Sequence, residues 1–310
     1  MSVARAFAPA SVSNLACGFD VLGFAVDGPG DEVVAELRDR PGLRIAELTG
    51  DGGRLPLDPA KNTAGVAVRH LLEQAGATEQ GVTLRVHKRM PLASGLGSSA
   101  ASAVAAVRAV DALLDLDLPR EALLRAALEG ERAACGSAHP DNATPSLYGG
   151  LVLIRSNDPL DVVELPVPED LSCALVRPHV EVETRAARQA LGEMVALGSA
   201  VRQWGNLGAL VAALYRGDLD LLSRSLVDHI AEPVRAPLVP GFREIQSAAR
   251  EAGALGCSLS GSGPSIFALC ATPESASTVA STMVAAAESL GLDCDQLVSP
   301  VGTQGAHILA

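Results

Sequence analysis

The chain has 310 residues, of which 48% are hydrophobic and only 3% aromatic, and its 24 basic side chains face 36 acidic ones, for a formal net charge of −12. A chain of this length exceeds what one hydrophobic core usually serves, so we expect two domains with aliphatic cores. The acidic balance and the lack of any basic run argue against binding to nucleic acid or to an anionic membrane.

The cysteines and the apolar segments indicate the cellular compartment of the protein. The six cysteines lie far apart with no C-x-x-C pair, which is typical of proteins in a reducing compartment. The N-terminus makes a poor signal peptide because Pro9 and Asn14 interrupt its apolar stretch, and no window reaches the ~20 apolar residues of a membrane helix. We therefore expect a cytoplasmic protein without a membrane segment.

The first predicted elements are short strands over Val3–Phe7 and Asp31–Glu36, on either side of an irregular loop. A clearer strand is predicted over Gly81–Lys88, where Val82, Leu84 and Val86 alternate with polar residues. This strand leads into a glycine-rich loop.

Two helices and a strand are predicted next. The first helix follows the glycine-rich loop and ends near Asp115, and the second opens at Pro119. After a polar turn, an apolar strand is predicted over Leu147–Ile154. The proline-rich stretch Asn157–Asp170, with a possible strand over Val162–Leu165, is the best candidate for the region between two domains.

Helices dominate the remaining predicted elements. They are expected over Thr184–Leu197, Asn206–Tyr215, Leu219–Ser225, Phe242–Ala252 and Pro273–Leu290. Strands are expected over Ser172–Val176, Ser265–Cys270 and Cys294–Val298. The mixture of strands and helices predicts α/β or α+β halves and not a helical bundle.

The glycine-rich loop Pro91-Leu-Ala-Ser-Gly-Leu-Gly-Ser-Ser-Ala-Ala-Ser102 is the strongest functional signal. Glycines let the backbone approach a ligand, and the N-terminus of the following helix offers unpaired N–H groups to a phosphate. Such a loop can also be a plain turn, and Gly95-x-Gly97-x-x-Ala100 also fits a dinucleotide fingerprint. The residues between the strand and Gly95 argue against that fingerprint, and the lack of Gly-Lys-Ser/Thr excludes a P-loop.

Glu131 and the segment that follows it are the next candidates. Glu131 shares a helical stripe with Leu124 and Leu128, where a carboxylate needs a partner, a metal ion or a frayed helix end. The segment His139-Pro-Asp-Asn142 would make an acceptable turn, and a lone histidine is more often structural than catalytic.

Further polar residues are scattered along the chain. Asp20 lies among apolar residues and needs a cationic partner. Arg188 and Arg235 come from separate segments, and two such arginines could bind one carboxylate through forked hydrogen bonds. The alternative is that both are ordinary arginines exposed on the surface. A second Gly/Ser loop over residues 260–265 precedes an apolar run and could be a simple hairpin turn.

Taken together, these segments resemble the homoserine kinase family of the GHMP kinase superfamily. The two glycine loops are similar to that superfamily's phosphate loop and C-terminal motif. The closer resemblance lies in Ser13–Asp20, Gly130-Glu131, His139–Asn142, Thr184–Arg188 and Glu232–Arg235. One departure stands out: the family's Asn-Leu-Gly-x-Gly-Phe-Asp has Ala16 in place of its first glycine.

The resemblance implies a fold and an activity. The fold is α+β with two domains, a ribosomal-protein-S5-like N-terminal one over residues 1–160 and a ferredoxin-like C-terminal one over residues 161–310. The implied activity is ATP- and Mg²⁺-dependent phosphorylation of the side-chain hydroxyl of L-homoserine, a step towards threonine, by a homodimer. Another alcohol kinase of the superfamily and a nicotinamide-dependent oxidoreductase remain as alternatives.

The resemblance also implies roles for individual residues. Asp20 takes the substrate ammonium, Arg188 and Arg235 take its carboxylate, and Asn14, His139 and Asn142 lie around the substrate, with Asn14 and Asn142 nearest the chemistry. Ser98 and Glu131 hold Mg²⁺, and Asn62 lies beside the adenine. The residues expected to bind the nucleotide are Asn62, Pro91, Leu92, Ala93, Ser94, Gly95, Leu96, Gly97, Ser98, Ser99, Ala100 and Ala101. No general base is assigned, because an asparagine, Asn142, stands where mevalonate-type relatives have an aspartate.

Overall fold

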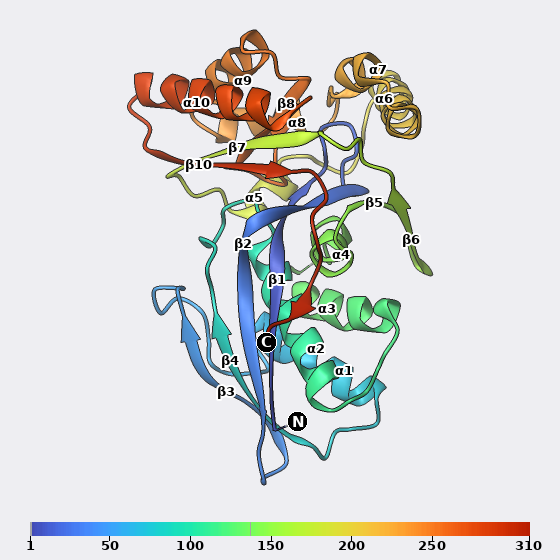
Figure 1. The fold of residues 1–310 in the computed structure, drawn as a ribbon, viewed down its shortest axis with the longest axis vertical. Helices are drawn as coiled ribbons and strands as arrows, with labels where there is room; N and C mark the ends of the chain where they lie inside the picture. The colour runs from blue at the N-terminus through green and yellow to red at the C-terminus, as the bar shows by residue number, and fades with distance from the viewer. Residues whose placement is uncertain (1, 137) are drawn as a thin grey trace.

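Two β-sheets, one from each half of the chain, organise the fold (Figure 1). Within residues 2–136 and 138–310, which the computed structural model describes, one sheet has seven strands and the other four. The larger sheet has the order β11-β1-β2-β4-β3, and β5 and β6 continue from the other end of β2. The last strand, β11, pairs with β1, so the C-terminus returns to the N-terminal half.

The elements of the N-terminal half alternate between this sheet and the helices that cover it. The strands are β1 (Val3–Ser13), β2 (Leu22–Leu37), β3 (Gly42–Thr49), β4 (Gly81–His87), β5 (Leu151–Asn157), β6 (Leu160–Leu165) and β11 (His307–Ile308). The helices are α1 (Thr63–Gln74), α2 (Ser98–Leu113), α3 (Arg120–Cys135) and α4 (Pro140–Tyr148).

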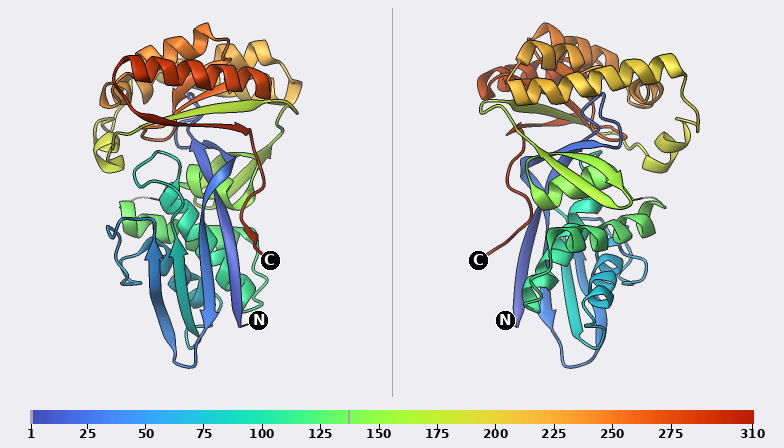
Figure 2. Two further views of the ribbon diagram at one scale, coloured as in Figure 1. Left: turned by 60° about the vertical axis from the view of Figure 1, so that its left-hand side comes forward. Right: turned by 90° about the vertical axis from the view of Figure 1, so that its right-hand side faces the viewer.

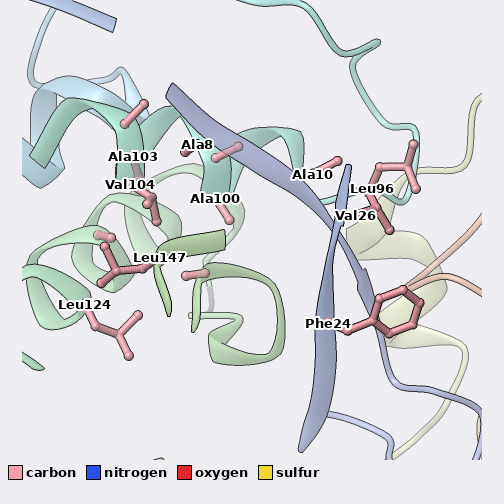
Figure 3. Packing of buried hydrophobic residues seen from close by; sticks show 14 of the residues in the cluster. Ala8, Ala10, Phe24, Val26, Leu96, Ala100, Ala103, Val104, Leu124 and Leu147 are labelled. Atoms are coloured by element: carbon pink, nitrogen blue, oxygen red, sulfur yellow. The ribbon is translucent and has the colours of Figure 1, made fainter. Parts of the chain in front are cut away.

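Helix α2 is the centre of the N-terminal core. It packs directly on β1 and β2, and α1, α3 and α4 pack against it in turn. Small side chains make this close approach possible: Ala100 and Ala103 of α2 and Ala8 and Ala10 of β1 are fully buried (Figure 3). The aliphatic core predicted from the low aromatic content is therefore built largely from alanine, valine and leucine.

The C-terminal half has the order β10-β7-β9-β8, with all neighbours antiparallel and helices on one face (Figure 2). In chain order this is 4-1-3-2, the ferredoxin-like arrangement. Its strands are β7 (Ser172–Pro178), β8 (Gly256–Leu259), β9 (Ile266–Cys270) and β10 (Cys294–Pro300). Its helices are α5 (Thr184–Gln189), α6 (Leu197–Arg216), α7 (Leu219–Ser225), α8 (Glu232–Arg235), the short 3₁₀ helix η1 (Ala236–Leu238), α9 (Phe242–Glu251) and α10 (Pro273–Ser289).

Most predicted elements are present, and the local signals explain why. Thr272 caps α10 through a reciprocal hydrogen-bond pair with Ser275, and Pro273 occupies its first turn. Asn62 caps α1 by accepting a hydrogen bond from the Ala64 amide. The stripe on α3 that carries Leu124 and Glu131 faces inward as predicted, since both side chains are buried.

Three predictions of local structure are wrong. The expected turn at His139–Asn142 is the start of α4, because Pro140 occupies its first turn, where its missing N–H costs nothing. That helix continues to Tyr148, so the strand predicted from Leu147 begins only at Leu151. The helix predicted over Thr184–Leu197 ends at Gln189, before Gly192 at φ 68°, and a new helix starts at Leu197.

The loop predicted between Phe7 and Asp31 is also wrong. Strands β1 and β2 extend through most of it, and a bulge between Pro9 and Ser11 absorbs the change of register. Only the turn Asn14–Val21 lies between them. The division at residues 160 and 161 stays a prediction, and strand β6, which starts at Leu160, is hydrogen-bonded to β5 in the larger sheet.

Candidate active site

One cavity of about 370 Å³ is lined by residues of both halves of the chain. It brings together most of the predicted site residues, namely Asn14, Asp20, Asn62, Leu92, Ala93, Ser94, Gly95, Gly97, Ser98, Ser99, Ala100, Glu131, His139, Asn142, Arg188 and Arg235. Three others do not line it: Leu96 and Ala101 are buried in the core, and Pro91 lines a neighbouring groove.

The glycine-rich loop ends directly at the N-terminus of α2. Gly97 is the N-cap residue at φ 68°, and the helix begins at Ser98 with no side chain capping its first amides. A Cβ at Gly97 would lie 2.4 Å from Ser11 Oγ and 3.0 Å from Asn142 Oδ1. Glycine is therefore required here both by backbone conformation and by space, and the free amides face the cavity end of the helix.

The second Gly/Ser loop holds the first one in place. Ser265 donates from its amide and from Oγ to the Ser94 carbonyl, at 3.3 and 2.7 Å, and Ser260 Oγ donates to the Gly95 carbonyl at 2.6 Å. At Gly95, a Cβ would lie 2.7 Å from the carbonyl oxygens of both Ser260 and Gly263. The two motifs thus form one hydrogen-bonded unit that joins the halves. The second loop is also the hairpin connection between β8 and β9, as the simpler alternative expected, since Leu259 pairs with Ile266 and the Ser260 amide donates to the Ser265 carbonyl at 2.9 Å.

Lys88 supports the same loop and was not singled out from the sequence. Its ammonium is buried, pairs with Asp31 and donates to the Ser98 carbonyl at 2.6 Å and to Ser102 Oγ at 2.8 Å. Asp31 also accepts from Ser102 Oγ at 2.6 Å. A lysine directly after a predicted strand is common on surfaces, and only the fold reveals its partners.

Four residues that line the cavity have a buried side-chain oxygen without a hydrogen-bond partner among the described residues: Ser13 Oγ, Ser94 Oγ, Ser98 Oγ and Glu131 Oε1. Of these, Ser98 and Glu131 are the predicted Mg²⁺ residues. The other carboxylate oxygen of Glu131 lies 3.5 Å from His139 Nδ1. Hydrogen bonding and charge from Glu131 raise the pKa of His139 against the opposing effect of burial. A carboxylate and a hydroxyl left unpaired are the hard oxygen donors that Mg²⁺ prefers, so these residues fit that ion. In the described part of the chain, no cluster of three or more acidic, histidine or cysteine side chains suggests a further metal site.

Charged side chains of opposite sign meet at the other end of the cavity. Arg188 Nη1 lies 2.5 Å from Asp20 Oδ2, and the guanidinium carbons of Arg188 and Arg235 lie 5.2 and 5.1 Å from the centre of the Phe19 ring. Arg235 is buried and donates to the Gly261 carbonyl at 3.0 Å. Burial is the main cause that lowers the pKa of its guanidinium. The cationic partner that the sequence required for Asp20 is thus Arg188.

The turn that carries Asn14 and Asp20 has an unusual backbone. Asn14, Leu15 and Ala16 have φ of 75°, 41° and 56°, and Asp20 has φ 61°. Asn14 stabilises the turn because its Oδ1 accepts from the Asp20 amide and its Nδ2 donates to the Gly261 carbonyl, both at 3.1 Å. Ala16, which stands at the glycine of the family stretch, therefore adopts the left-handed conformation despite its Cβ.

Asp141 and Asn142 reach the cavity from the first turn of α4. Asn142 Oδ1 accepts from Ser11 Oγ at 3.3 Å. Asp141 is buried, and desolvation together with the nearby charge of Asp20 raises its pKa to about 6. Asp141 was not among the predicted site residues, because a turn was expected at His139–Asn142 and turn residues are usually exposed.

Asn62 lies at the edge of the cavity, where it begins α1. Its Oδ1 caps the helix, and its Nδ2 donates to the Pro56 carbonyl at 2.9 Å. Pro56, which this hydrogen bond joins to Asn62, lines the cavity together with Leu48 and Leu55, and we call this part its apolar end. The lining thus combines an apolar end, the glycine loop and a group of charged side chains.

The fold and this site define a kinase of the GHMP class. The family described as "GHMP kinases N terminal domain" matches residues 62–150, and "GHMP kinases C terminal" matches residues 210–289. Homoserine kinases of Chlorobium phaeobacteroides (strain BS1) and Chlorobium phaeovibrioides are 49% and 50% identical, with full coverage of both chains. The crystal structure of homoserine kinase from Cytophaga hutchinsonii is similar with a TM-score of 0.97 at 52% identity, covering 100% of this chain and 98% of that one. The chain belongs to the homoserine kinase family.

This membership confirms the expected two-domain GHMP kinase fold and an ATP-dependent kinase that acts on an alcohol. The oxidoreductase alternative does not fit the sheet, because β4, the strand before the glycine loop, is antiparallel to β2 and parallel only to β3. A dinucleotide fingerprint belongs to a parallel doubly wound sheet. In the described residues, no helix is long and apolar enough to cross a bilayer.

Proposed function

We propose that the protein transfers the γ-phosphoryl group of ATP to the side-chain hydroxyl of L-homoserine, giving O-phospho-L-homoserine in threonine biosynthesis. The observation that carries this proposal is the meeting of Asp20 with Arg188 and Arg235 in the cavity that also contains the glycine loop. An amino acid zwitterion needs one carboxylate and a separate cationic site, and few other alcohols need both.

The nucleotide occupies the apolar end and the glycine loop. The adenine lies beside Asn62, and the triphosphate lies against the loop of residues 91–101. Pro91, Leu96 and Ala101 do not line the cavity and contribute by shaping the backbone of this loop. The free amides at the start of α2 supply partial positive charge without a mobile side chain. Mg²⁺ would be held by Ser98 and Glu131, where it would neutralise phosphate charge.

The amino acid replaces an ion pair that exists without it. Asp20 takes the ammonium, and Arg188, released from Asp20, joins Arg235 around the carboxylate. Both guanidinium groups make cation–π contacts with the Phe19 ring, and these contacts offset part of the electrostatic repulsion between the two positive charges. His139, Asn14 and Asn142 surround the side chain of the substrate, which brings its hydroxyl towards the start of α2.

The chemistry at the hydroxyl depends chiefly on alignment. Phosphoryl transfer passes through a loose transition state, in which the attacking oxygen need not lose its proton early. Asn142, held by Ser11, orients the hydroxyl by hydrogen bonding. No side chain is assigned as general base.

A coupled ADP-release assay with homoserine, mevalonate, shikimate and galactose tests the proposal, and homoserine alone should support turnover. Arg235→Met should raise the KM for homoserine by about a hundredfold, because a charge-assisted pair is lost, and should leave the KM for ATP unchanged. Turnover of another alcohol, unaffected by this substitution, would favour a different alcohol kinase.

Assembly and location are part of the same proposal. We propose a homodimer, supported by an exposed apolar stripe on α6 formed by Leu197, Val201, Trp204 and Tyr215, which a second copy of the chain would cover. Sedimentation should then give a dimer, and Trp204→Glu a monomer. The five cysteines whose side chains the structure describes, Cys17, Cys173, Cys257, Cys270 and Cys294, are free thiols, which supports a cytoplasmic location.

A further inference from the structure

Gln203 is the buried polar residue of a helix whose neighbouring positions are exposed. It lies on α6, and its side chain is 5% exposed, whereas Arg202 and Trp204 face solvent. Helix α6 runs across the C-terminal half, and the turn between β1 and β2 reaches up towards it (Figure 2). No role in nucleotide or substrate contact accounts for a buried carboxamide at this position, since Gln203 does not line the cavity.

The amide nitrogen and the amide oxygen of Gln203 both form hydrogen bonds, and these bonds link α6 to two other segments of the chain. Nε2 donates to the Cys17 carbonyl and to Asp228 Oδ1, both at 3.0 Å, and Oε1 accepts from the His229 amide at 2.8 Å. Cys17 belongs to the turn that carries Asn14 and Asp20. Gln203 therefore ties that turn, from behind, to the segment that begins at Asp228.

Asp228 in turn fixes the short helix that ends at Arg235. Its carboxylate accepts from the three amides of residues 230–232 at 2.8 to 3.0 Å, so it holds the segment that leads into α8 and the first amide of that helix. Arg235 lies at the last position of α8 and points towards the Gly261 carbonyl. The side chain of Gln203, through its hydrogen bonds with the Cys17 carbonyl, Asp228 and the His229 amide, thus connects the helix of Arg235 with the turn of Asp20.

The turn needs such a restraint. Three successive non-glycine residues, Asn14 to Ala16, have left-handed backbones, a conformation that is unfavourable for residues with a Cβ. Strained backbone persists only where the surroundings over-determine it. Asn14 restrains the turn from the cavity side through Gly261, and the Cys17 carbonyl is the point at which Gln203 restrains it from the opposite side.

We propose that Gln203 is a positioning residue that sets the separation between Asp20 and Arg235. The inference rests on the proposed function, which assigns the ammonium to Asp20 and the carboxylate to Arg235. Because the α-ammonium and α-carboxylate of an amino acid have a fixed separation, a turn that drifts away from α8 weakens binding of the amino acid. The nucleotide loop, which is held by Lys88 and by residues 260–265, does not depend on Gln203.

Gln203→Met tests this role because methionine keeps the length and volume of the side chain and removes its hydrogen bonds. We expect the KM for homoserine to rise about tenfold, with the KM for ATP and the kcat at saturation within about twofold of the parent. Hydrogen exchange at the amides of residues 14–22 should become faster, and exchange in α2 should not change.

Asn206→Ala is the matched control. Asn206 lies on the same helix and donates to the Val227 carbonyl at 2.9 Å, one residue before Asp228, but it does not contact the turn. Its loss should change neither the KM for homoserine nor exchange in residues 14–22. Should Gln203→Met fail to fold, Gln203→Glu keeps an acceptor for the His229 amide, removes both Nε2 donors and should produce the same selective rise in KM.

The outcomes separate this inference from the proposed function. A parent enzyme that releases no ADP with homoserine refutes the proposed function, whereas the exchange experiment still reports whether Gln203 restrains the turn. With an active parent, an unchanged KM for homoserine, or an equal rise in the KM for both substrates, overturns the positioning role. A rise confined to homoserine, with faster exchange at residues 14–22, supports it.

Discussion

Asp141 occupies a position where burial and a neighbouring charge act in the same direction. Its carboxyl is enclosed at the start of α4, near Asp20, and both effects raise its pKa to about 6 from an ordinary value of 3.8. The folded state therefore binds a proton more tightly than the unfolded state. The stability that this group contributes is fully present below pH 4 and is lost as the pH rises through 6.

Asp141→Asn should consequently stabilise the protein relative to the parent more at pH 8 than at pH 4, because asparagine never carries the buried charge. Calorimetry at the two pH values measures the difference in Tm. Asp39→Asn is the control, because Asp39 is exposed to solvent. Its Tm should differ from that of the parent by the same small amount at both pH values. A difference for Asp141→Asn that does not change with pH would contradict the buried-charge explanation.

Gly95 tests whether space, and not backbone conformation alone, requires glycine in the phosphate loop. Gly95 and Gly76 both have positive φ, 77° and 64°, but a Cβ would meet two carbonyl oxygens at 2.7 Å at Gly95 and nothing within 4 Å at Gly76. Gly76→Ala should cost about 1 kcal/mol of unfolding free energy from conformation alone.

Gly95→Ala should cost a further 1–3 kcal/mol or so from overpacking, and it should raise the KM for ATP because the two Gly/Ser loops are forced apart. Urea unfolding and initial-rate kinetics provide the two measurements. Equal losses of stability in the two variants would show that the loops separate without strain.

Single side chains also mark the limit of what the sequence predicts. Asp20 was singled out because a carboxylate among apolar residues needs a cationic partner, and the resemblance to the homoserine kinase family assigned Arg188 and Arg235 to the same site. The fold brings the three together. Three other residues were missed for one shared reason, namely Lys88, Asp141 and Gln203. The role of each depends on contacts with residues that are far away in the sequence. Lys88 depends on Asp31, and Gln203 depends on the turn near Cys17.

Among the secondary-structure elements, those with strong periodic or capping signals were predicted well. The alternation in β4 places both of its ends within one residue of those observed, and the alanine-rich pattern of α2 places its C-terminal end within two residues. The start of α2 was predicted too late, because the helix begins at Ser98, inside the predicted loop. Helix α4 was missed because Pro140 and Pro145 resemble turn residues, although a proline in the first turn of a helix is well tolerated. Strands β1 and β2 were predicted too short because their small residues give no alternation.

The start of α2 depends on the buried pair of Lys88 and Asp31. Lys88→Met leaves Asp31 buried without its cation, which should cost about 3–5 kcal/mol of unfolding free energy. Replacing both residues, as Lys88→Met with Asp31→Asn, should restore most of that stability, because a buried ion pair is close to neutral against its uncharged replacement.

The double variant should nevertheless keep a raised KM for ATP, since the hydrogen bond from Lys88 to the Ser98 carbonyl is then lost. The KM for homoserine should remain that of the parent. Guanidinium unfolding and steady-state kinetics on the single and double variants measure both effects. If the double variant recovers the KM for ATP along with its stability, the pair serves stability alone.

The two halves of the chain share more than the cavity. One continuous core joins residues of the first sheet, such as Leu22 and Phe24, with Leu171, Leu175 and Phe267 of the second half. A smaller core lies beneath α9 and α10 within the C-terminal half. Because the larger core crosses between the sheets, neither half can lose its packing without exposing apolar surface of the other.

We therefore expect the protein to unfold in a single calorimetric transition. A ligand bound in the cavity should raise the Tm of this one transition, which reports the unfolding of both halves. At 100 times its Kd, either ATP or homoserine should add about 2.7 kcal/mol of stability. Arg235→Met should abolish the increase with homoserine and keep the increase with ATP, whereas Gly95→Ala should weaken the increase with ATP. Two separate transitions, of which homoserine shifts only one, would show that the shared core does not couple the halves.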